Sequence, residues 1–175
     1  MKIKENLVVK PTDSGVRINN RNVGNFVADG LHSLWRDEVL CDIKLVCNSV
    51  EMLVHKTILA MYSDYFKAMF TIGLTESSQT MPCVQLNETS PEALRSLLQY
   101  MYTGSLLVTK DTAQDLIVLT DLLQMRIIKD HCCQFMENNL DSSNCLGIWD
   151  FAETYGCTTL LVKVISLVKR RFNVV

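Results

Sequence analysis

The sequence lacks the signatures of most enzymes and of nucleic-acid-binding proteins. It contains no Gly-rich phosphate loop and no Ser-His-Asp arrangement. The net charge is −2, with 17 Lys and Arg against 19 Asp and Glu, so no basic excess favours nucleic acid or an anionic membrane. No apolar run approaches the roughly 20 residues of a membrane span, and the N-terminal stretch MKIKENLVVK is too polar for a signal-peptide core. We therefore expect a non-catalytic protein without a cofactor that binds neither nucleic acid nor membrane.

Metal ligands are also scarce. The chain has three histidines and no Cys-x-x-Cys pair, whereas a zinc site needs paired ligands at finger-like spacing. The seven cysteines are odd in number, and most lie within apolar periodic segments. We interpret them as reduced, mostly buried thiols of an intracellular protein. Cys132 and Cys133 would be redox-sensitive only if their exposure and pKa allowed it.

The chain has enough apolar material for one compact domain with an appendage. Hydrophobic residues make up 48% of its 175 residues, and the mean hydropathy is +0.13. Residues 1–22 are polar and lack a helical period. They predict a flexible lead, although Leu7–Val9 could add an edge strand.

Periodicity in the first half predicts both helices and strands. Apolar residues recur at helical spacing from Val23 to Trp35. Alternation over 41–47 and 50–54, with Asn48-Ser49 between them, predicts a hairpin with a tight turn. The next expected elements are a helix over 56–61, a helix that starts at Ser63, and a short strand over 82–86.

The second half is expected to be mostly helical. Ser90 and Pro91 form a strong helix start, and Gly104 ends that helix. The cluster at 141–144 is typical of a further N-cap. The other expected elements are a short strand at 106–108 and helices over 111–123, 126–139, 145–155 and 161–172. The expected fold class is therefore α+β, with an α-helical hairpin at the end.

The segment that follows the helix beginning at Ser63 has the pattern of a docking point. Gly73 suits the left-handed residue that ends a helix. Leu74-Thr75-Glu76 then places a large apolar side chain two residues from a carboxylate, so a partner could bury the Leu and pair the Glu. Taken alone the pattern is ordinary, because Leu-x-Glu is common and a single surface Leu needs no explanation.

Several motifs in a fixed order make the chain resemble the BTB/POZ domain of Kelch-like proteins. The matching stretches are Leu40–Val46, Val54–Lys56, Ser63–Phe70, Pro91–Leu94 and Tyr100–Gly104. Two later stretches resemble the 3-box that opens the BACK domain of those proteins: Asn144–Ile148 and Phe151–Cys157. The resemblance implies a BTB/POZ domain over 23–139 and a 3-box, the N-terminal part of a BACK domain, over 140–172.

The resemblance further implies a substrate adaptor of a cullin-3 ubiquitin ligase. Such adaptors dimerise through the BTB domain and dock the N-terminal domain of cullin-3 through the BTB helices and the 3-box. The docking motif of the family, an apolar residue, any residue and then Glu, falls on Leu74-Thr75-Glu76, with Tyr65 and Phe70 in the preceding helix. Substrate is usually carried by a later Kelch propeller.

A groove for an extended cullin segment is expected in the 3-box hairpin. Its candidate residues are Cys145, Ile148, Ala152 and Leu161. The alternative is that these four residues only pack on one another.

The resemblance also implies a dimer interface. An apolar stripe on the first helix would bury against a symmetry mate, through Phe26, Val27, Leu31 and Leu34. Asp42 and Lys56 match positions that form a charged pair near the dimer centre, and we assign this pair to dimer specificity because a buried pair is weak evidence for stability. Two alternatives stay open: the stripe packs on its own domain, and the two charges are unrelated.

The sequence departs from the family pattern in three places. Ser49 stands where the hairpin usually turns at Gly, and Met52 where Phe is common. The chain stops at Val175, short of a full BACK domain and of Kelch repeats, so we expect a fragment or a short isoform without the substrate-binding region. A corepressor-binding transcriptional module and a cytoskeletal oligomerisation scaffold remain as alternative functions. The expected location is the cytoplasm, with the nucleus or cytoskeleton as alternatives.

Overall fold

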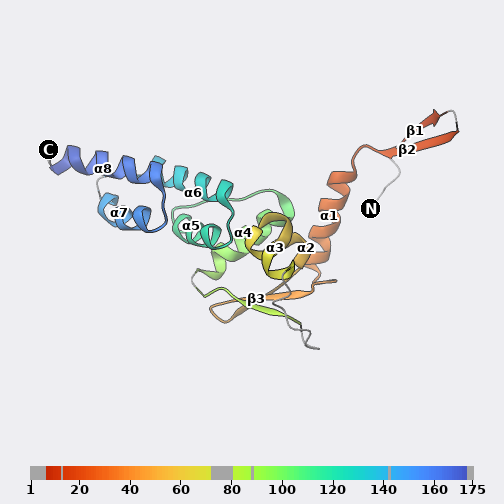
Figure 1. Ribbon diagram of the computed structural model, residues 1–175, viewed down its shortest axis with the longest axis horizontal. Helices are drawn as coiled ribbons and strands as arrows, with labels where there is room; N and C mark the ends of the chain where they lie inside the picture. Colours follow the sequence, from red (N-terminus) through yellow and green to blue (C-terminus); the bar gives the residue numbers. More distant parts are fainter. Residues whose placement is uncertain (1–6, 13, 72–80, 88, 142, 173–175) are drawn as a thin grey trace.

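The computed structural model begins with strands and ends with helices (Figure 1). It describes residues 7–12, 14–71, 81–87, 89–141 and 143–172. The first elements are β1 (Leu7–Thr12), β2 (Gly15–Asn20), α1 (Val23–Arg36), β3 (Ile43–Cys47), β4 (Val50–Val54), α2 (Lys56–Tyr62) and α3 (Asp64–Thr71). The later ones are β5 (Cys83–Gln85), α4 (Pro91–Thr103), α5 (Ala113–Leu122), α6 (Arg126–Asn138), α7 (Cys145–Thr154) and α8 (Thr158–Phe172). The mixed α+β class is confirmed.

A small sheet with strand order β4-β3-β5 lies along one side of helices α2 to α4 (Figure 1). β3 pairs antiparallel with β4, with Ile43 opposite Val54, and parallel with β5. Alternation along β3 buries one face, where Ile43, Leu45 and Cys47 are fully buried. The predicted hairpin is thus confirmed, although β3 begins at Ile43 and not at Cys41.

The turn between β3 and β4 has left-handed backbone at both central residues. Asn48 has φ 46° and Ser49 has φ 68°, as in the type I′ turns that suit the twist of a hairpin. The Asn48 side chain also donates a hydrogen bond to the Thr89 carbonyl at 3.1 Å. Ser49 pays a conformational cost that Gly would avoid, which explains why Gly is usual at this position.

Helix α4 passes through the core and has the ends that its sequence predicts. The Ser90 hydroxyl accepts from the Ala93 N–H at 3.2 Å, Pro91 occupies the first turn, and Gly104 ends the helix with φ 74°. One face of the helix is buried through Ala93, Leu94, Leu97, Leu98, Met101 and Tyr102.

The chain between α4 and α5 forms no strand in the described residues, so the prediction for 106–108 is wrong. Leu107 is 78% exposed, and the described sheet contains only β3, β4 and β5. The run at 106–108 pairs with none of these strands, and an apolar run alone does not make a strand. The next helix, α5, starts at Ala113, one residue later than an Asp111 cap would give, and its N-cap residue is Thr112. The Thr112 hydroxyl accepts from the Thr109 N–H at 3.2 Å in the preceding turn.

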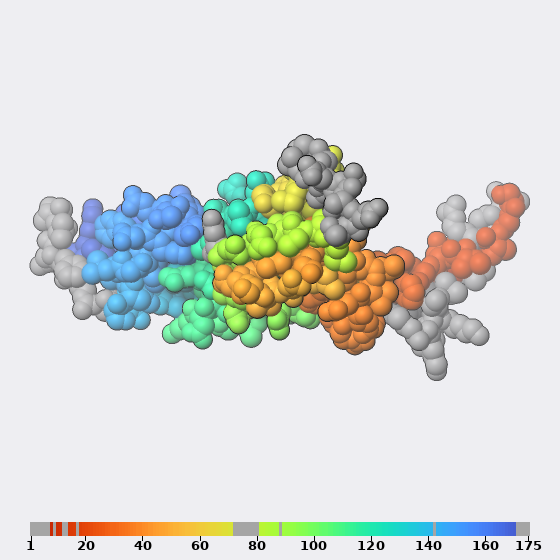
Figure 2. All heavy atoms as spheres, turned by 90° about the horizontal axis from the view of Figure 1, so that it is seen from below, coloured from red at the N-terminus to blue at the C-terminus, as the bar shows by residue number. Residues whose placement is uncertain are grey.

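The lead predicted for residues 1–22 contains a regular hairpin over 7–20. β1 and β2 pair antiparallel, with Lys10 opposite Arg17, and they form a sheet of their own. Figure 2 shows this hairpin projecting from the body of the molecule. Val16 and Ile18 are 63% and 64% exposed. Leu7–Val9 therefore lies in a strand, but not at the edge of the main sheet.

The last four helices extend away from the sheet toward the opposite end of the molecule (Figure 1). α5 packs on α6, α7 on α8, and α8 also contacts α6. The predicted cap cluster starts α7, since the Asp141 carboxylate accepts from the backbone N–H groups of Ser143 and Asn144. The Ser143 hydroxyl also donates to this carboxylate. The hydroxyl bond, followed by the two backbone bonds, lowers the pKa of Asp141. Gly156, with φ 61°, makes the turn into α8.

The structure bears on the predictions about cysteine burial and about membrane spans. Five of the seven cysteines are buried, Cys41 is half-buried and Cys83 is exposed. Among the described residues, no helix combines the length and the apolar character that crossing a membrane requires.

Candidate functional site

Helix α3 is fixed at its start by Ser63. The Ser63 hydroxyl accepts from the Phe66 N–H at 3.2 Å and donates to the Leu123 carbonyl at 2.7 Å, which ties α3 to the end of α5. Phe66 is fully buried and stacks on Phe70, with ring centroids 5.7 Å apart. Tyr65 and Phe70 are half-buried and pack against the core. These two predicted docking residues therefore hold α3 in place.

The predicted docking tripeptide itself lies beyond the end of α3. Leu74, Thr75 and Glu76 fall within 72–80, outside the residues that the structure describes. Their role stays a prediction from the sequence.

An apolar groove that the sequence did not predict lies between the end of α2, α4 and the turn from α5 into α6. Its volume is about 280 Å³, and its walls include Tyr62, Tyr100, Met125 and Ile127. Tyr62 meets Tyr100 edge to face at 5.7 Å, and Ile127 is 73% exposed. The sequence feature that could have predicted this groove is the Ile127-Ile128 pair at the start of a helix. Adjacent helical side chains point in different directions, so the two isoleucines cannot share one buried face.

The structure places most of the predicted 3-box groove in the interior of the helical hairpin. Cys145, Ile148 and Ala152 are buried, and Leu161 is half-buried against the core. Of these, Ile148 borders a cavity of about 390 Å³ whose walls also include Phe135. The four residues therefore pack within the helical hairpin, as the alternative left open by the sequence has it, and their role in a cullin groove stays a prediction. Helical spacing identifies the face that is buried, and it cannot tell which neighbour buries it.

The apolar residues that the helical hairpin exposes are not the four predicted groove residues. Leu146 on α7 is 58% exposed and Val162 on α8 is 69% exposed. Any partner that docks on the hairpin would meet these side chains first.

Helix α1 has no buried residue, although its apolar spacing is clear. Phe26 and Val27 are 38% and 48% exposed, whereas Leu31 and Leu34 are half-buried. Leu31 packs against the core of its own domain, on the wall of a groove of about 480 Å³ that reaches Met61 on α2. The predicted stripe is thus divided between an outward and an inward part.

Asp42 and Lys56 are brought together through the backbone. The exposed Asp42 carboxylate accepts from the Lys56 N–H at 2.7 Å, which satisfies a donor in the first turn of α2. The described structure contains no ion pair between the two side chains. Within one chain Asp42 therefore acts as a helix cap and not as the partner of a lysine ammonium.

A polar cluster beside this cap anchors α1. The Tyr102 hydroxyl accepts from the His55 N–H at 3.1 Å and lies 2.7 Å from His55 Nδ1, while His55 Nε2 lies 3.0 Å from the Val39 carbonyl. Since a carbonyl only accepts, Nε2 carries the proton and Nδ1 accepts from the tyrosine. Trp35 stacks on Tyr102 at 4.4 Å and donates to the Leu53 carbonyl at 3.1 Å. Burial raises the pKa of Tyr102 to about 12, and His55 has a structural role.

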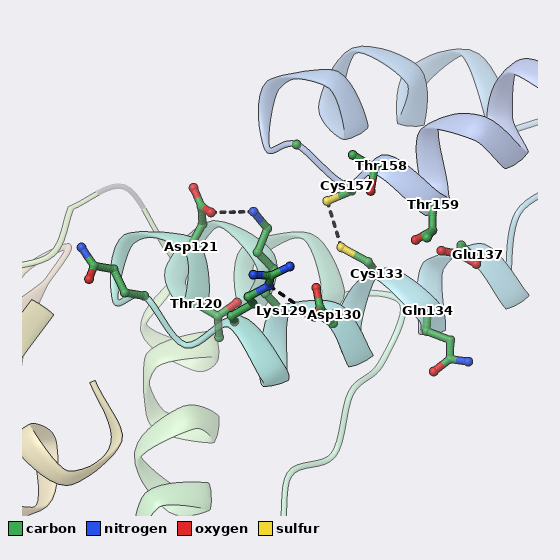
Figure 3. Close-up of a pocket in the computed structure, with 13 residues that line it drawn as sticks. Thr120, Asp121, Lys129, Asp130, Cys133, Gln134, Glu137, Cys157, Thr158 and Thr159 are labelled. Atoms are coloured by element: carbon green, nitrogen blue, oxygen red, sulfur yellow. Dashed lines mark hydrogen bonds and ion pairs between the residues drawn. The ribbon is translucent and has the colours of Figure 1, made fainter. Parts of the chain in front are cut away.

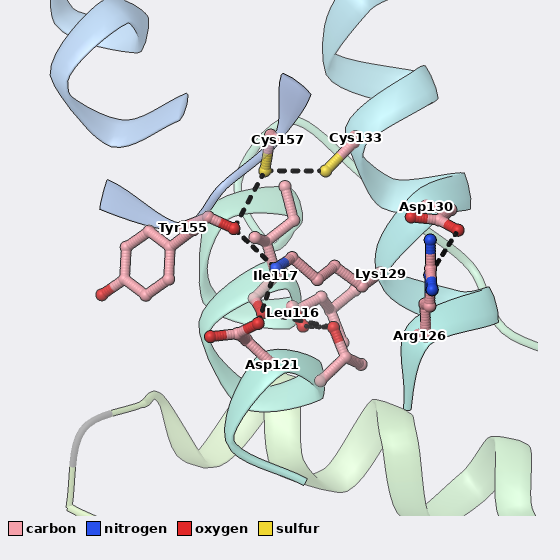
Figure 4. Close-up of polar contacts among 10 residues, drawn as sticks. Leu116, Ile117, Asp121, Arg126, Lys129, Asp130, Cys133, Tyr155 and Cys157 are labelled. Atoms are coloured by element: carbon pink, nitrogen blue, oxygen red, sulfur yellow. Dashed lines mark hydrogen bonds and ion pairs between the residues drawn. The ribbon is translucent and has the colours of Figure 1, made fainter. Parts of the chain in front are cut away.

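A lysine joins the helical hairpin to the preceding helices (Figure 4). The Lys129 ammonium, on α6, donates to Asp121 on α5 and to the Tyr155 carbonyl after α7, each at 2.5 Å. The Lys129 side chain is only 16% exposed. The hairpin therefore packs on α6 through a polar contact as well as through apolar side chains.

Comparisons with known proteins agree on one family. Residues 31–140 match the family described as BTB/POZ domain. The chain belongs to the BTB/POZ domain family. The BTB domain of human gigaxonin has a TM-score of 0.56 and 26% identity, covering 68% of this chain and 95% of that one. The BTB domain of zebrafish PATZ1 (TM-score 0.58, 22% identity, 67% and 93% covered) shows the same fold.

Two curated relatives of this BTB domain are Kelch-like proteins. Human Kelch-like protein 28 is 38% identical over 146 residues, which are 83% of this chain and 25% of that protein. Mouse Kelch-like protein 17 is 44% identical over 123 residues, which are 70% of this chain and 19% of that protein. The chain thus spans about a quarter or less of the length of these relatives. No catalytic family is indicated, and the 3-box assignment of 140–172 stays a prediction.

Proposed function

We propose that this BTB domain is the homodimeric, non-catalytic adaptor part of a cullin-3 ubiquitin ligase. The observation that supports this most is the 38–44% identity to Kelch-like proteins over 123–146 residues. The helical hairpin α7–α8 adds support, because it continues directly from α6 and packs on it. An adaptor needs surfaces that bind other proteins and no catalytic site. The described residues include several exposed apolar side chains that could form such surfaces.

Cullin docking is assigned to the segment after α3 and to its surroundings. Leu74 is the apolar anchor, worth roughly 1.5–3 kcal/mol if fully buried. Glu76 supplies specificity, since loss of one partner of a buried polar pair costs about 1–3 kcal/mol. The groove lined by Tyr62 and Ile127 supports the proposal because it is an apolar hollow at the last residue of α2, which Ser63 alone separates from α3.

Calorimetry with the N-terminal domain of cullin-3 tests this proposal. The unaltered chain should bind, whereas Leu74→Asp and Glu76→Ala should each weaken binding at least about tenfold, which is about 1.4 kcal/mol. Leu107→Asp is the matched control, because Leu107 is 78% exposed and lies in a different loop. Absence of heat at tens of micromolar would refute cullin docking by this chain, and unchanged affinity of both variants would refute the site.

The groove can be tested separately. Ile127→Asp changes a side chain that is already 73% exposed, so the fold should survive, as circular dichroism can check. If the groove is part of the docking surface, the affinity for the cullin domain falls. If only the segment after α3 binds, the affinity of Ile127→Asp matches that of Leu107→Asp.

Dimerisation is assigned to the outward part of α1 and to the loop that follows it. Phe26 and Val27 are exposed there, as are Val39 and Leu40, at 45% and 76%. Leu40 also has φ 60°, a costly backbone conformation for a bulky residue that persists only where the surroundings impose it. These exposed apolar side chains, near the start of α1 and just after its end, support an interface along this helix.

Light scattering tests the dimer. The mass should be about twice the 19.9 kDa of one chain, and Phe26→Asp should reduce it to that of one chain. Leu107→Asp should leave the mass unchanged. A monomer at tens of micromolar would refute the interface, and a dimer that gives no heat with the cullin domain would favour a corepressor module or a scaffold.

A further inference from the structure

Two thiols meet where α6 passes the start of α8 (Figure 3). The Cys133 thiol donates a hydrogen bond to the Cys157 sulfur, with the two Sγ atoms 2.9 Å apart. Cys133 lies on α6, within the BTB match, and Cys157 lies just before α8. Both are 4–5% exposed, and both lie on the wall of a surface cavity of about 800 Å³. The contact between the two thiols therefore borders this cavity.

Three features around Cys157 favour its thiolate. Its carbonyl accepts from the Leu161 N–H at 2.8 Å, so Cys157 occupies the N-cap of α8, where the helix end is positive. The Lys129 ammonium lies close by, since it donates to the Tyr155 carbonyl two residues before Cys157. The hydrogen bond from Cys133 and the Lys129 charge lower the pKa of Cys157, against opposing contributions from burial and from Asp121 and Asp130.

The partner thiol has the opposite character. Its hydrogen bond to Cys157, followed by burial, raises the pKa of Cys133, so this thiol keeps its proton. The pair therefore combines a nucleophilic sulfur with a protonated sulfur in direct contact, as in a nucleophile and its resolving thiol.

We propose that Cys157 and Cys133 are a peroxide-sensitive thiol pair whose disulfide fastens the α7–α8 hairpin to α6. The Cys157 thiolate attacks one oxygen of hydrogen peroxide and becomes a sulfenic acid, while the O–O bond breaks and the other oxygen leaves as hydroxide. The Cys133 sulfur then attacks the sulfenic sulfur, its proton passes to the departing hydroxyl group, and water is released. The two thiols are oxidised by two electrons, and the peroxide is reduced to two waters.

The structure predicts selectivity among the cysteines. Burial raises the pKa of the adjacent Cys132 to about 11, so it holds little thiolate at neutral pH. Cys83 is exposed, but it lies on β5, away from this cavity. A disulfide requires the two sulfurs to approach from 2.9 Å to about 2.05 Å, a short movement compared with that of any pair not in contact. The inference is independent of cullin docking, since it concerns only this pair.

Peptide mapping without reductant, after treatment of the chain with hydrogen peroxide, tests the proposal. We expect one cross-linked peptide pair that contains Cys133 and Cys157, a mass lower by two hydrogens, and a melting temperature raised by about 5–10 °C. A reducing agent should reverse all three. Cys157→Ser should abolish the cross-link, and Cys132→Ser, which changes the next residue on the same helix, should keep it.

The rate provides a second readout that does not depend on the cysteine variants. Lys129→Met should slow the cross-linking several-fold at neutral pH and move its pH profile upward, because the nearby positive charge is lost. Oxidation of Cys83 while Cys133 and Cys157 stay reduced would overturn the proposal. If a variant fails to fold, the peptide map of the unaltered chain still decides.

Discussion

Tyr102 connects three parts of the chain through one side chain. Its hydroxyl bonds to His55, its ring stacks on Trp35 of α1, and its backbone belongs to α4. Tyr102→Phe keeps the ring and removes the hydroxyl, so the His55 N–H and Nδ1 lose their partner. We expect the free energy of unfolding to fall by about 1–3 kcal/mol in urea denaturation. Tyr62→Phe, on a half-exposed side chain, is the control and should change it little.

The same residue predicts sensitivity to alkali. The pKa of Tyr102 is raised from 10.0 to about 12 by burial, so the unfolded chain loses this proton first as the pH rises. Its stabilising contribution is therefore complete below about pH 10 and is lost between about pH 10 and 12. Unfolding midpoints measured from pH 8 upward should show the difference between the unaltered chain and Tyr102→Phe shrinking in this range. A constant difference would contradict the assignment.

Ser49 offers a prediction of the opposite sign. Because its φ is 68° in a type I′ turn, Ser49→Gly should raise the free energy of unfolding by about 1 kcal/mol. Gly104→Ser is the matched reverse change: Gly104 has φ 74° and open space around it, so only backbone strain is added. Thermal unfolding should move up for the first variant and down for the second.

For the helices and strands, the sequence predicted correctly the features that depend on neighbouring residues, such as helix ends and tight turns. Helix α4 has the ends expected from Ser90 and Gly104, and the β3–β4 hairpin has its turn at Asn48-Ser49. The strand at 106–108 was wrong because pairing depends on a distant edge. The β1–β2 hairpin was not predicted because polar residues interrupt the alternation of apolar and polar side chains in its short strands.

The candidate site was less predictable than the fold, because its contacts are remote in sequence. The His55–Tyr102 hydrogen bond spans 47 residues, and the Lys129–Tyr155 contact spans 26. Apolar periodicity located the faces of α7 and α8, but it could not show that Cys145 and Ala152 face inward and Val162 outward. The Cys133–Cys157 contact requires the packing of α8 on α6, which no spacing rule gives.

The attachment of the helical hairpin can be tested as an element. Lys129→Met removes the donor that Asp121 and the Tyr155 carbonyl share, while it keeps the apolar stem. We expect faster amide hydrogen exchange in α8, with little change in α4. Equal exchange rates in both helices of the variant and the unaltered chain would show that apolar packing alone holds the hairpin.

For the whole molecule, the proposed dimer face and the helical hairpin lie at opposite ends. The β1–β2 hairpin and α1 are at one end and α8 at the other, with the sheet and α3 between them (Figures 1 and 2). Dimerisation and cullin docking should therefore not compete. We expect Phe26→Asp to be monomeric and still to bind the cullin domain with the affinity per chain of the unaltered protein, as calorimetry would measure. A large loss of affinity would show that the dimer builds the docking surface.

The most direct test of the adaptor function is the mass of the complex in solution. Size-exclusion chromatography with light scattering, on a mixture of the chain and the N-terminal domain of cullin-3, reports both assembly steps together. The account predicts one peak whose mass equals two chains of 19.9 kDa with one cullin domain bound to each. Separate peaks for the free chain and the free cullin domain, at concentrations of tens of micromolar, would contradict it.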